Sequence, residues 1–364
     1  MEGKYKPKGE FEREVRGFCS EFGGIVNAHV HGDRAYTRRD DYYSHVGVSV
    51  SDIDKLTLPE KQQLTWALHT GRAFEKDCIE ERMRRMIDES IYFGVKQIFT
   101  TVDVTYNTKL KSLDVAEKLR DEYAGKLDLK IGIYNTSGFK EKGLADERFE
   151  LFEEASKRCD FLMGLAEKDR SKDHMGERQH NSYMLQLAYK TGKPAHFHVG
   201  QENRHTDNTL ELLLDEIKEV QDVHLRVGFE DFPEIVAVHA ISSSCKDHEM
   251  FDNVAYRMAQ RNIGLICCPR AAISMLQDSS LYSPTHNSIA KVWDFAIKGV
   301  KIKGLGVDNL DDIFVPATSA DVYDETEDLA NSLRSYRQRI LAKVMCGEDL
   351  DEFDVGDLRR TLFS

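Results

Sequence analysis

Residue types that bind metal ions end four apolar segments of this sequence. The segment Ile25–His31 ends in two histidines, His29 and His31, and later segments end at His198, at His239 and at Asp308. Alternate residues of a strand point to the same face, so His29 and His31 can reach a single ion. Three of these four imidazoles, in their neutral form, and the carboxylate would form a ligand set that suits Zn²⁺ or Fe²⁺. We therefore predict a metal centre with one ion per chain.

A metal ion in this position would give the site hydrolytic chemistry. The ion lowers the pKa of a bound water molecule toward about 7, which supplies hydroxide at neutral pH. Hydroxide can attack an electrophilic ring or amide carbon, while side chains beside the ion accept its proton and stabilise the developing charge. Collapse would then expel ammonia, an amine or a ring nitrogen.

The elements that must position these side chains follow a strand–helix rhythm. Apolar, β-rich runs alternate with stretches of helical periodicity, such as those at 110–122, 183–190, 210–220 and 250–260. The eight predicted strands are Ile25–His31, Val95–Val104, Leu129–Thr136, Phe161–Ala166, Pro194–Gly200, Ile235–Ser242, Gly264–Pro269 and Ile302–Asp308. The polar residues come at the carboxyl ends of these strands, which is where a (β/α)8 TIM barrel forms its active site. We predict that α/β barrel, and a doubly wound sheet of the same strands is the alternative.

The whole chain, 1–364, is predicted to be a single barrel domain. The barrel occupies about 24–345, of which 321–345 is predicted to be one long helix, and 346–364 follows as a polar tail. An unusually long connection spans 33–94, and connections of that length are commonly lids or binding loops. Its residues Tyr42, Tyr43 and His45 could form a lid, and an ordinary polar loop is the equal alternative.

The composition limits the partners of this chain. Its 63 acidic and 50 basic residues give a formal net charge of −13, which argues against nucleic acid as the partner. No window is apolar enough to span a membrane, and the basic N-terminal residues are not followed by the apolar stretch of a secretory signal. Seven scattered cysteines without a C-x-x-C motif indicate reduced thiols. We expect a cytoplasmic homo-oligomer that acts on a small molecule.

Several motifs resemble the amidohydrolase superfamily. The run 29–37, HVHGDRAYT, is similar to the HxHLDKAFT signature of the cytosine deaminase-like branch, and adenosine deaminase is a more distant resemblance. Further matches in sequence character are Cys268-Pro269, MLQ at 275–277, IAKV at 289–292, GVDN at 306–309 and FVP at 314–316. The resemblance covers about 24 to 340, which is most of the predicted barrel.

This resemblance implies a role for each residue at the predicted metal centre. One catalytic metal would be held by His29, His31, His198 and Asp308. His239 would bond to the attacking water or to the tetrahedral intermediate. Many members of the superfamily add a β-sandwich built from both termini, but His29 leaves no room for its N-terminal half, so we expect the barrel to stand alone.

The sequence departs from the family pattern at the proton shuttle. Relatives that deaminate usually carry a glutamate three residues after the strand-five histidine, and here that position is Gln201, followed by Glu202. An amide cannot exchange protons, so Gln201 could orient or recognise a substrate but not act as an acid. Either Glu202 takes the role, or Asp308 and His239 handle the protons, or the reaction is not a deamination.

The fifth predicted strand contains a second histidine that competes for the metal. His196 shares a strand face with His198, about 6.8 Å deeper by the two-residue rise. The three-residue spacing from His198 to Gln201 and the Val-Gly turn favour His198 as the ligand. We therefore expect His196 to contact the metal ligands without binding the metal, or to belong to the core.

Other polar residues stand near the predicted mouth of the barrel. Asp103, Glu167 and Asn309 are predicted to contact the substrate, as is Gln201. For Asp103 and for the run 167–169 (EKD), surface ion pairing is the equal alternative.

Three functions remain open. The first is a metal-dependent deaminase of a small nucleobase-like heterocycle. The second, favoured by Gln201, is a hydrolase of a cyclic or N-alkylated amide that opens a ring or releases an amine. The third is a non-catalytic ligand-binding barrel. The chain has no His-x-Glu paired with Pro-Cys-x-x-Cys, which excludes the unrelated zinc deaminase fold.

Overall fold

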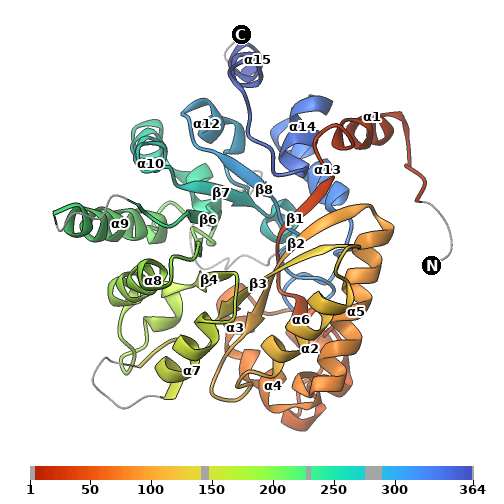
Figure 1. Ribbon diagram of the computed structural model, residues 1–364, viewed down its shortest axis with the longest axis vertical. Coiled ribbons are helices and arrows are strands. Elements are labelled where there is room, and N and C mark those ends of the chain that lie inside the picture. The colour runs from red at the N-terminus through yellow and green to blue at the C-terminus, as the bar shows by residue number, and fades with distance from the viewer. Residues whose placement is uncertain (1–4, 141–146, 227–230, 275–288, 363–364) are drawn as a thin grey trace.

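The protein forms a ring of parallel strands with helices outside it (Figure 1). The computed structural model describes residues 5–140, 147–226, 231–274 and 289–362. Within them one sheet has eight strands in the order of the sequence, each parallel to the next. The strands are β1 (Ile25–Val30), β2 (Val95–Asp103), β3 (Asp128–Tyr134), β4 (Phe161–Gly164), β5 (Ala195–Val199), β6 (Ile235–His239), β7 (Gly264–Cys267) and β8 (Ile302–Leu305).

The residues after β8 close the ring onto β1. The backbone N–H of His31 donates to the carbonyl of Asp308 at 2.8 Å, and the N–H of Asp308 donates to the carbonyl of His29 at 2.9 Å. Closure by neighbouring strands in sequence order is the arrangement of a (β/α)8 barrel. The predicted TIM barrel is therefore confirmed, and the doubly wound alternative is wrong.

Buried strands with large side chains fill the barrel interior. All five residues of β5 and all five of β6 are buried, as expected for parallel strands covered on both sides. Gly132 on β3 leaves space for the ring of Phe161 on β4, because a Cβ at Gly132 would lie 2.3 Å from that ring. This close approach explains a glycine inside a strand.

The helices surround the barrel and connect its strands (Figure 1). None of those in the described ranges combines the length and hydropathy needed to cross a membrane. The α-helices are α1 (Glu10–Cys19), α2 (Val50–Ile53), α3 (Leu58–Gln63), α4 (Thr65–Thr70), α5 (Lys76–Tyr92), α6 (Lys111–Glu122), α7 (Glu147–Ser156), α8 (Glu177–Thr191), α9 (Thr209–Arg226), α10 (His248–Gln260), α11 (Pro269–Ser274), α12 (Val292–Ile297), α13 (Val322–Leu333), α14 (Gln338–Met345) and α15 (Glu352–Leu362).

The C-terminal part differs from the prediction. The single helix expected over 321–345 is wrong, because the chain breaks it into α13 and α14. Arg334 ends α13 in the left-handed conformation, with φ of 54°, which the periodicity of apolar residues does not reveal. The segment expected as a polar tail contains α15.

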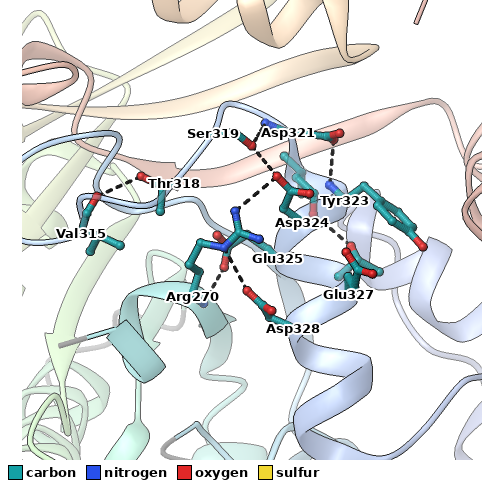
Figure 2. A network of polar contacts seen from close by, with 12 residues as sticks. Arg270, Val315, Thr318, Ser319, Asp321, Tyr323, Asp324, Glu325, Glu327 and Asp328 are labelled. Atoms are coloured by element: carbon teal, nitrogen blue, oxygen red, sulfur yellow. Dashed lines mark hydrogen bonds and ion pairs between the residues drawn. The ribbon is translucent and has the colours of Figure 1, made fainter. Parts of the chain in front are cut away.

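A polar network joins the carboxyl end of β7 to α13 (Figure 2). Arg270, at the start of α11, donates from Nε to Asp328 at 2.9 Å and from a terminal nitrogen to Asp324 at 3.2 Å. Its backbone N–H donates to the buried carboxyl of Glu325 at 2.8 Å. The network holds this edge of the barrel next to the segment that follows β8.

Candidate metal centre and pocket

Four of the predicted site residues converge at the carboxyl end of the barrel. His29 lies on β1, His31 directly after it, His198 on β5 and Asp308 three residues after β8. Each offers one ligand atom, and these atoms all lie within 4.8 Å of one another. All four residues are at most 5% exposed. Among the residues that the structure describes, this is the one group of three or more such side chains that could hold an ion.

The spacing of these donor atoms suits a metal ion. Nε2 of His29 lies 3.0 Å from Nε2 of His198 and 3.3 Å from Oδ1 of Asp308, and Nε2 of His31 lies 3.4 Å from the same oxygen. Ligands about 2.0–2.1 Å from a tetrahedral ion are about 3.3 Å apart. Burial, together with nearby Arg34, lowers the pKa of His31 well below the usual range. Burial and nearby His29 lower the pKa of His198 in the same way, so both imidazoles are neutral. The residues present therefore fit a divalent cation.

His239 lies beside the four-residue cluster at the end of β6. Its ring centre is 5.0 Å from that of His198 and 6.1 Å from that of His29. Burial lowers its pKa to about 4, against the opposing effect of Asp308. His239 and Asp308 have positive φ values, 78° and 61°, which are uncommon for residues with a side chain. Strained backbone at two strand ends facing one cluster is typical of a functional site.

A buried chain of polar contacts supports the cluster from the β2 side. The guanidinium of Arg34 contacts Nδ1 of His31, and its Nε lies 3.5 Å from Oδ2 of Asp103. The same carboxylate oxygen is 2.8 Å from Nε2 of His69. Asp103 is completely buried and does not line the pocket, so in this geometry it contacts Arg34 and His69.

A mostly polar pocket opens beside the cluster. Its walls come from strand ends on one side and from α3 and α4 on the other. The lining residues are His31, Arg34, Leu58, Gln62, Thr65, Tyr134, Thr136, Leu165, Lys168, His198, Gln201, Asp308, Asn309 and Phe314. The long connection therefore covers the site through α3 and α4, while Tyr42, Tyr43 and His45 are not among the lining residues.

Two of the predicted substrate contacts line this pocket. Gln201 lies in the turn after β5, and Asn309 follows Asp308 directly. The side-chain oxygen of Asn309 is buried and accepts no hydrogen bond from the described residues. Both residues thus present amide groups where a heterocycle with carbonyl and N–H groups could bind.

The two glutamates named from the sequence lie beyond the pocket wall. The carboxylate of Glu202 pairs with Arg204 and lies 3.7 Å from Arg170. Glu167 accepts a hydrogen bond from Nε2 of Gln201 at 3.3 Å. Glu167 thus contacts Gln201, which lines the pocket and stands where deaminating relatives usually have a glutamate.

The remaining strand-end candidates have internal partners. His196 stacks on Phe161 with ring centres 4.5 Å apart, and burial lowers its pKa to about 3. The four-residue cluster of possible metal ligands contains His198 and not His196. Asp169 is completely buried and accepts from His180 and from the backbone of Phe139, both at 2.7 Å.

Sequence reasoning missed several residues of the pocket. Arg34 stood inside the HVHGDRAYT motif, where the family has a lysine, and that position was a signal that could have identified it. Leu58, Gln62 and Thr65 lie on short helices of the long connection, and no spacing in the sequence marks them. MLQ at 275–277, used for the family resemblance, lies outside the described residues.

The chain has a sequence relative but matches no family model. It is 26% identical over 281 residues to an uncharacterized protein of Haemophilus influenzae (strain ATCC 51907 / DSM 11121 / KW20 / Rd). The match covers 77% of this chain and 92% of that protein.

Solved structures share the barrel across most of the chain. The 5-methylcytosine deaminase of Klebsiella pneumoniae, liganded with phosphonocytosine, has a TM-score of 0.71 at 17% identity, covering 93% of this chain and 82% of its own. The N-isopropylammelide isopropylaminohydrolase of Burkholderia multivorans ATCC 17616 has 0.63 at 18%, covering 89% and 74%. An adenosine deaminase of Xanthomonas campestris with bound zinc has 0.52 at 14%, covering 91% and 64%. The chain therefore has the fold of these deaminases and of this aminohydrolase, which bears out, at the level of fold, the resemblance to the cytosine deaminase-like branch.

Proposed function

We propose that this protein is a metal-dependent hydrolase of the amidohydrolase superfamily, in its cytosine deaminase-like branch, that deaminates a small nucleobase-like heterocycle. The observation that carries the proposal is the convergence of three imidazoles and one carboxylate at the carboxyl end of the barrel, beside a pocket with amide groups. This end of a TIM barrel is where its enzymes form their active sites. The neighbouring structures include a cytosine-type deaminase and an adenosine deaminase, which supports the same class of reaction.

One Zn²⁺ or Fe²⁺ per chain is part of this proposal. His29, His31, His198 and Asp308 would hold it, and imidazole with carboxylate is a donor set that both ions accept. The zinc in the adenosine deaminase neighbour supports zinc. When bound, the ion would lower the pKa of a water molecule and supply hydroxide near neutral pH.

The chain's own residues then bind the substrate and move protons. Asp308 accepts a proton from the attacking water, and His239, neutral and beside it, stabilises the charge that develops on the substrate. Gln201 and Asn309 bind the carbonyl and N–H groups of the ring. Glu202 is not essential, because its carboxylate is paired with Arg204. Asp103 holds Arg34 against His31 and does not itself touch the substrate.

A second candidate is the hydrolysis of a cyclic or N-alkylated amide. An amide side chain at position 201 favours it, because the deaminating members of the family usually have a glutamate there. The isopropylaminohydrolase neighbour, named for release of an alkylamine, supports it as well.

Incubation with a substrate panel tests the proposal. The protein, loaded with Zn²⁺ or with Fe²⁺, is incubated with cytosine, creatinine, a triazine and a cyclic imide, and the products are identified by mass spectrometry. Release of ammonia from a ring amino group supports deamination, whereas ring opening or amine release supports the second candidate. A protein that binds no metal and converts no panel member would be the ligand-binding barrel instead.

The proposal also includes the cellular location and the oligomeric state of the protein. We infer a cytoplasmic location, which the absence of disulfides among the described cysteines supports, and a homo-oligomer that acts on small molecules and not on nucleic acid. Light scattering on the purified protein determines the oligomeric state.

A further inference from the structure

We propose that the pocket selects ring compounds that carry a negatively charged oxygen group, and that Lys168 is the residue that binds this group. The inference rests on the proposed function, since it names the class of heterocycle that the same site accepts. Two cationic side chains, Arg34 and Lys168, line the pocket beside the four-residue cluster. Their surroundings differ, and the difference leaves Lys168 to bind an anion.

The turn after β4 fixes the position of Lys168 in the pocket wall. Lys168 lies in a short 3₁₀ turn that follows this strand. The next residue, Asp169, is completely buried, and its carboxylate accepts from His180 and from the backbone of Phe139, both at 2.7 Å. Because Asp169 anchors the turn to two neighbouring segments, the backbone of Lys168 is held at the mouth of the barrel.

The ammonium group of Lys168 has no ion-pair partner among the carboxylates that the structure describes, although its side chain is only partly exposed. Burial and the guanidinium of Arg34 lower the pKa of Lys168 to about 8, while Glu167 and Asp103 oppose this decrease. At neutral pH most of the population therefore keeps its positive charge. A partly buried charge without a partner costs free energy, and a bound anion would offset that cost.

Arg34, the second cation, is held by other residues of the wall. Its guanidinium contacts Nδ1 of His31 and lies 3.5 Å from Asp103. Its central carbon is 5.7 Å from the ring centre of Tyr134 and 5.8 Å from that of Phe314. These contacts fix Arg34 in place, where its charge adds to the positive potential around Lys168.

The acids near the two cations do not cancel this potential. Burial raises the pKa of three of them, so that they carry less negative charge at neutral pH than exposed carboxylates would: Asp33, Glu167 and Asp312. Asp103 lies against Arg34, and Asp308 belongs to the cluster, where the charge of a divalent ion would exceed its own. A positive pocket in a chain with a formal net charge of −13 is the distribution that attracts a small anion.

The opposite side of the pocket suits the ring of the same ligand. Asn309 follows β8 and Lys168 follows β4, and these two strands lie across the eight-stranded ring from each other (Figure 1). The buried side-chain oxygen of Asn309 accepts no hydrogen bond from the described residues, so it can accept one from a ring N–H. A heterocycle bound across the mouth would thus have its N–H toward Asn309 and its anionic oxygen toward Lys168.

Binding of matched neutral and anionic rings tests the proposal. Uracil, uracil-6-carboxylate and barbiturate, which is ionised at neutral pH, are titrated into the zinc-loaded protein by isothermal titration calorimetry. The two anions separate a carboxylate substituent from an ionised ring oxygen as the source of the charge. We expect at least one of them to bind at least about tenfold more tightly than uracil, since a hydrogen bond to a charged group is worth that factor or more.

Substitutions of Lys168 connect this preference to one side chain. The neutral variants Lys168→Met and Lys168→Gln should lose at least about tenfold in affinity for the preferred anion and little for uracil. Lys168→Arg keeps the charge and should retain more of the preference. Lys172→Met, which replaces an exposed lysine four residues away, is the matched control and should bind as wild type does. Melting temperature and metal content are measured on every preparation.

Two results would overturn the proposal. One is equal affinity of folded, zinc-loaded wild type for uracil and for both anions. The other is a folded, zinc-loaded neutral variant that keeps the full preference, because the ion or Arg34 would then bind the anion. Calorimetry needs no turnover, so a preference for anions without conversion of any C–N substrate would refute the proposed hydrolysis alone. Conversion of neutral rings without that preference would refute the selection of anions alone.

Discussion

The substitution His239→Asn separates catalysis from metal binding at this site. His239 has a φ of 78°, and asparagine is among the few residues with a side chain that tolerate that conformation. An alanine would remove the ring but meet the unfavourable backbone. With asparagine the backbone and the four-residue cluster should remain, while the imidazole is lost. The protein should therefore fold and keep its metal.

The expected loss of turnover follows from the place of the ring. His239 is 2% exposed, so no water can readily replace its contact with the reacting group. Loss of one acid–base or oxyanion contact in such a site lowers the rate about 10²- to 10⁴-fold. At about 1.4 kcal/mol per factor of ten, this corresponds to about 3 to 5 kcal/mol of transition-state stabilisation.

Three measurements on one preparation decide this prediction. Turnover is measured by ammonia release, metal content by elemental analysis and folding by thermal melting. His248→Asn, an exposed histidine at the start of α10, is the matched control and should behave as wild type. Loss of the metal from His239→Asn would make His239 a ligand and refute its role beside the cluster. A metal-loaded variant with wild-type turnover would refute its catalytic role.

Three further predictions concern the metal content, the amide of Gln201 and the polar network around Glu325 on α13. Elemental analysis of active protein should give about one Zn²⁺ or Fe²⁺ per chain, and two ions, or none, would contradict the single centre. Gln201→Ala should raise KM more than it lowers kcat, because the amide binds the substrate, and a loss confined to kcat would show otherwise. Burial raises the pKa of Glu325 to about 8 from an unfolded value near 4.5, so its stabilising contribution is complete below pH 4.5 and is lost as the pH rises toward 8. Glu325→Gln should therefore flatten the fall in unfolding free energy between pH 5 and 8 measured with urea, and parallel curves would refute the assignment.

The periodicity of short segments was sufficient to predict the barrel. All eight strands were recognised, because strands buried on both faces are nearly continuous apolar runs, and their polar residues mark the carboxyl ends. The same local rule placed His29 and His31 on one face. Since carboxyl ends of barrel strands meet at one edge, the polar strand ends were expected to converge there. The choice of His198 and Asp308 as the partners of His29 and His31 came from the family resemblance.

Other features depend on contacts between segments far apart in the sequence. The break lies between Arg334, which is left-handed, and Arg337, which is extended, and the helical spacing of apolar residues continues through it. The sequence therefore predicted one helix over 321–345 where the structure has two. Leu58, Gln62 and Thr65 reach the pocket because α3 and α4 fold back over the barrel mouth. A local pattern carries no information on where a connection of this length returns.

The amino-acid sequence determined which residues stand at the carboxyl ends of the strands, and therefore the side chains from which the proposed metal centre is built. Tertiary structure alone decided how those ends meet: it brought Arg170 to 3.7 Å from Glu202 and set Glu167 beside Gln201. The physical reason is that successive residues of a strand point to opposite faces, so the face of each side chain follows from the local sequence. Which side chain meets which across two strands depends on register and on barrel closure, and both are properties of the whole chain.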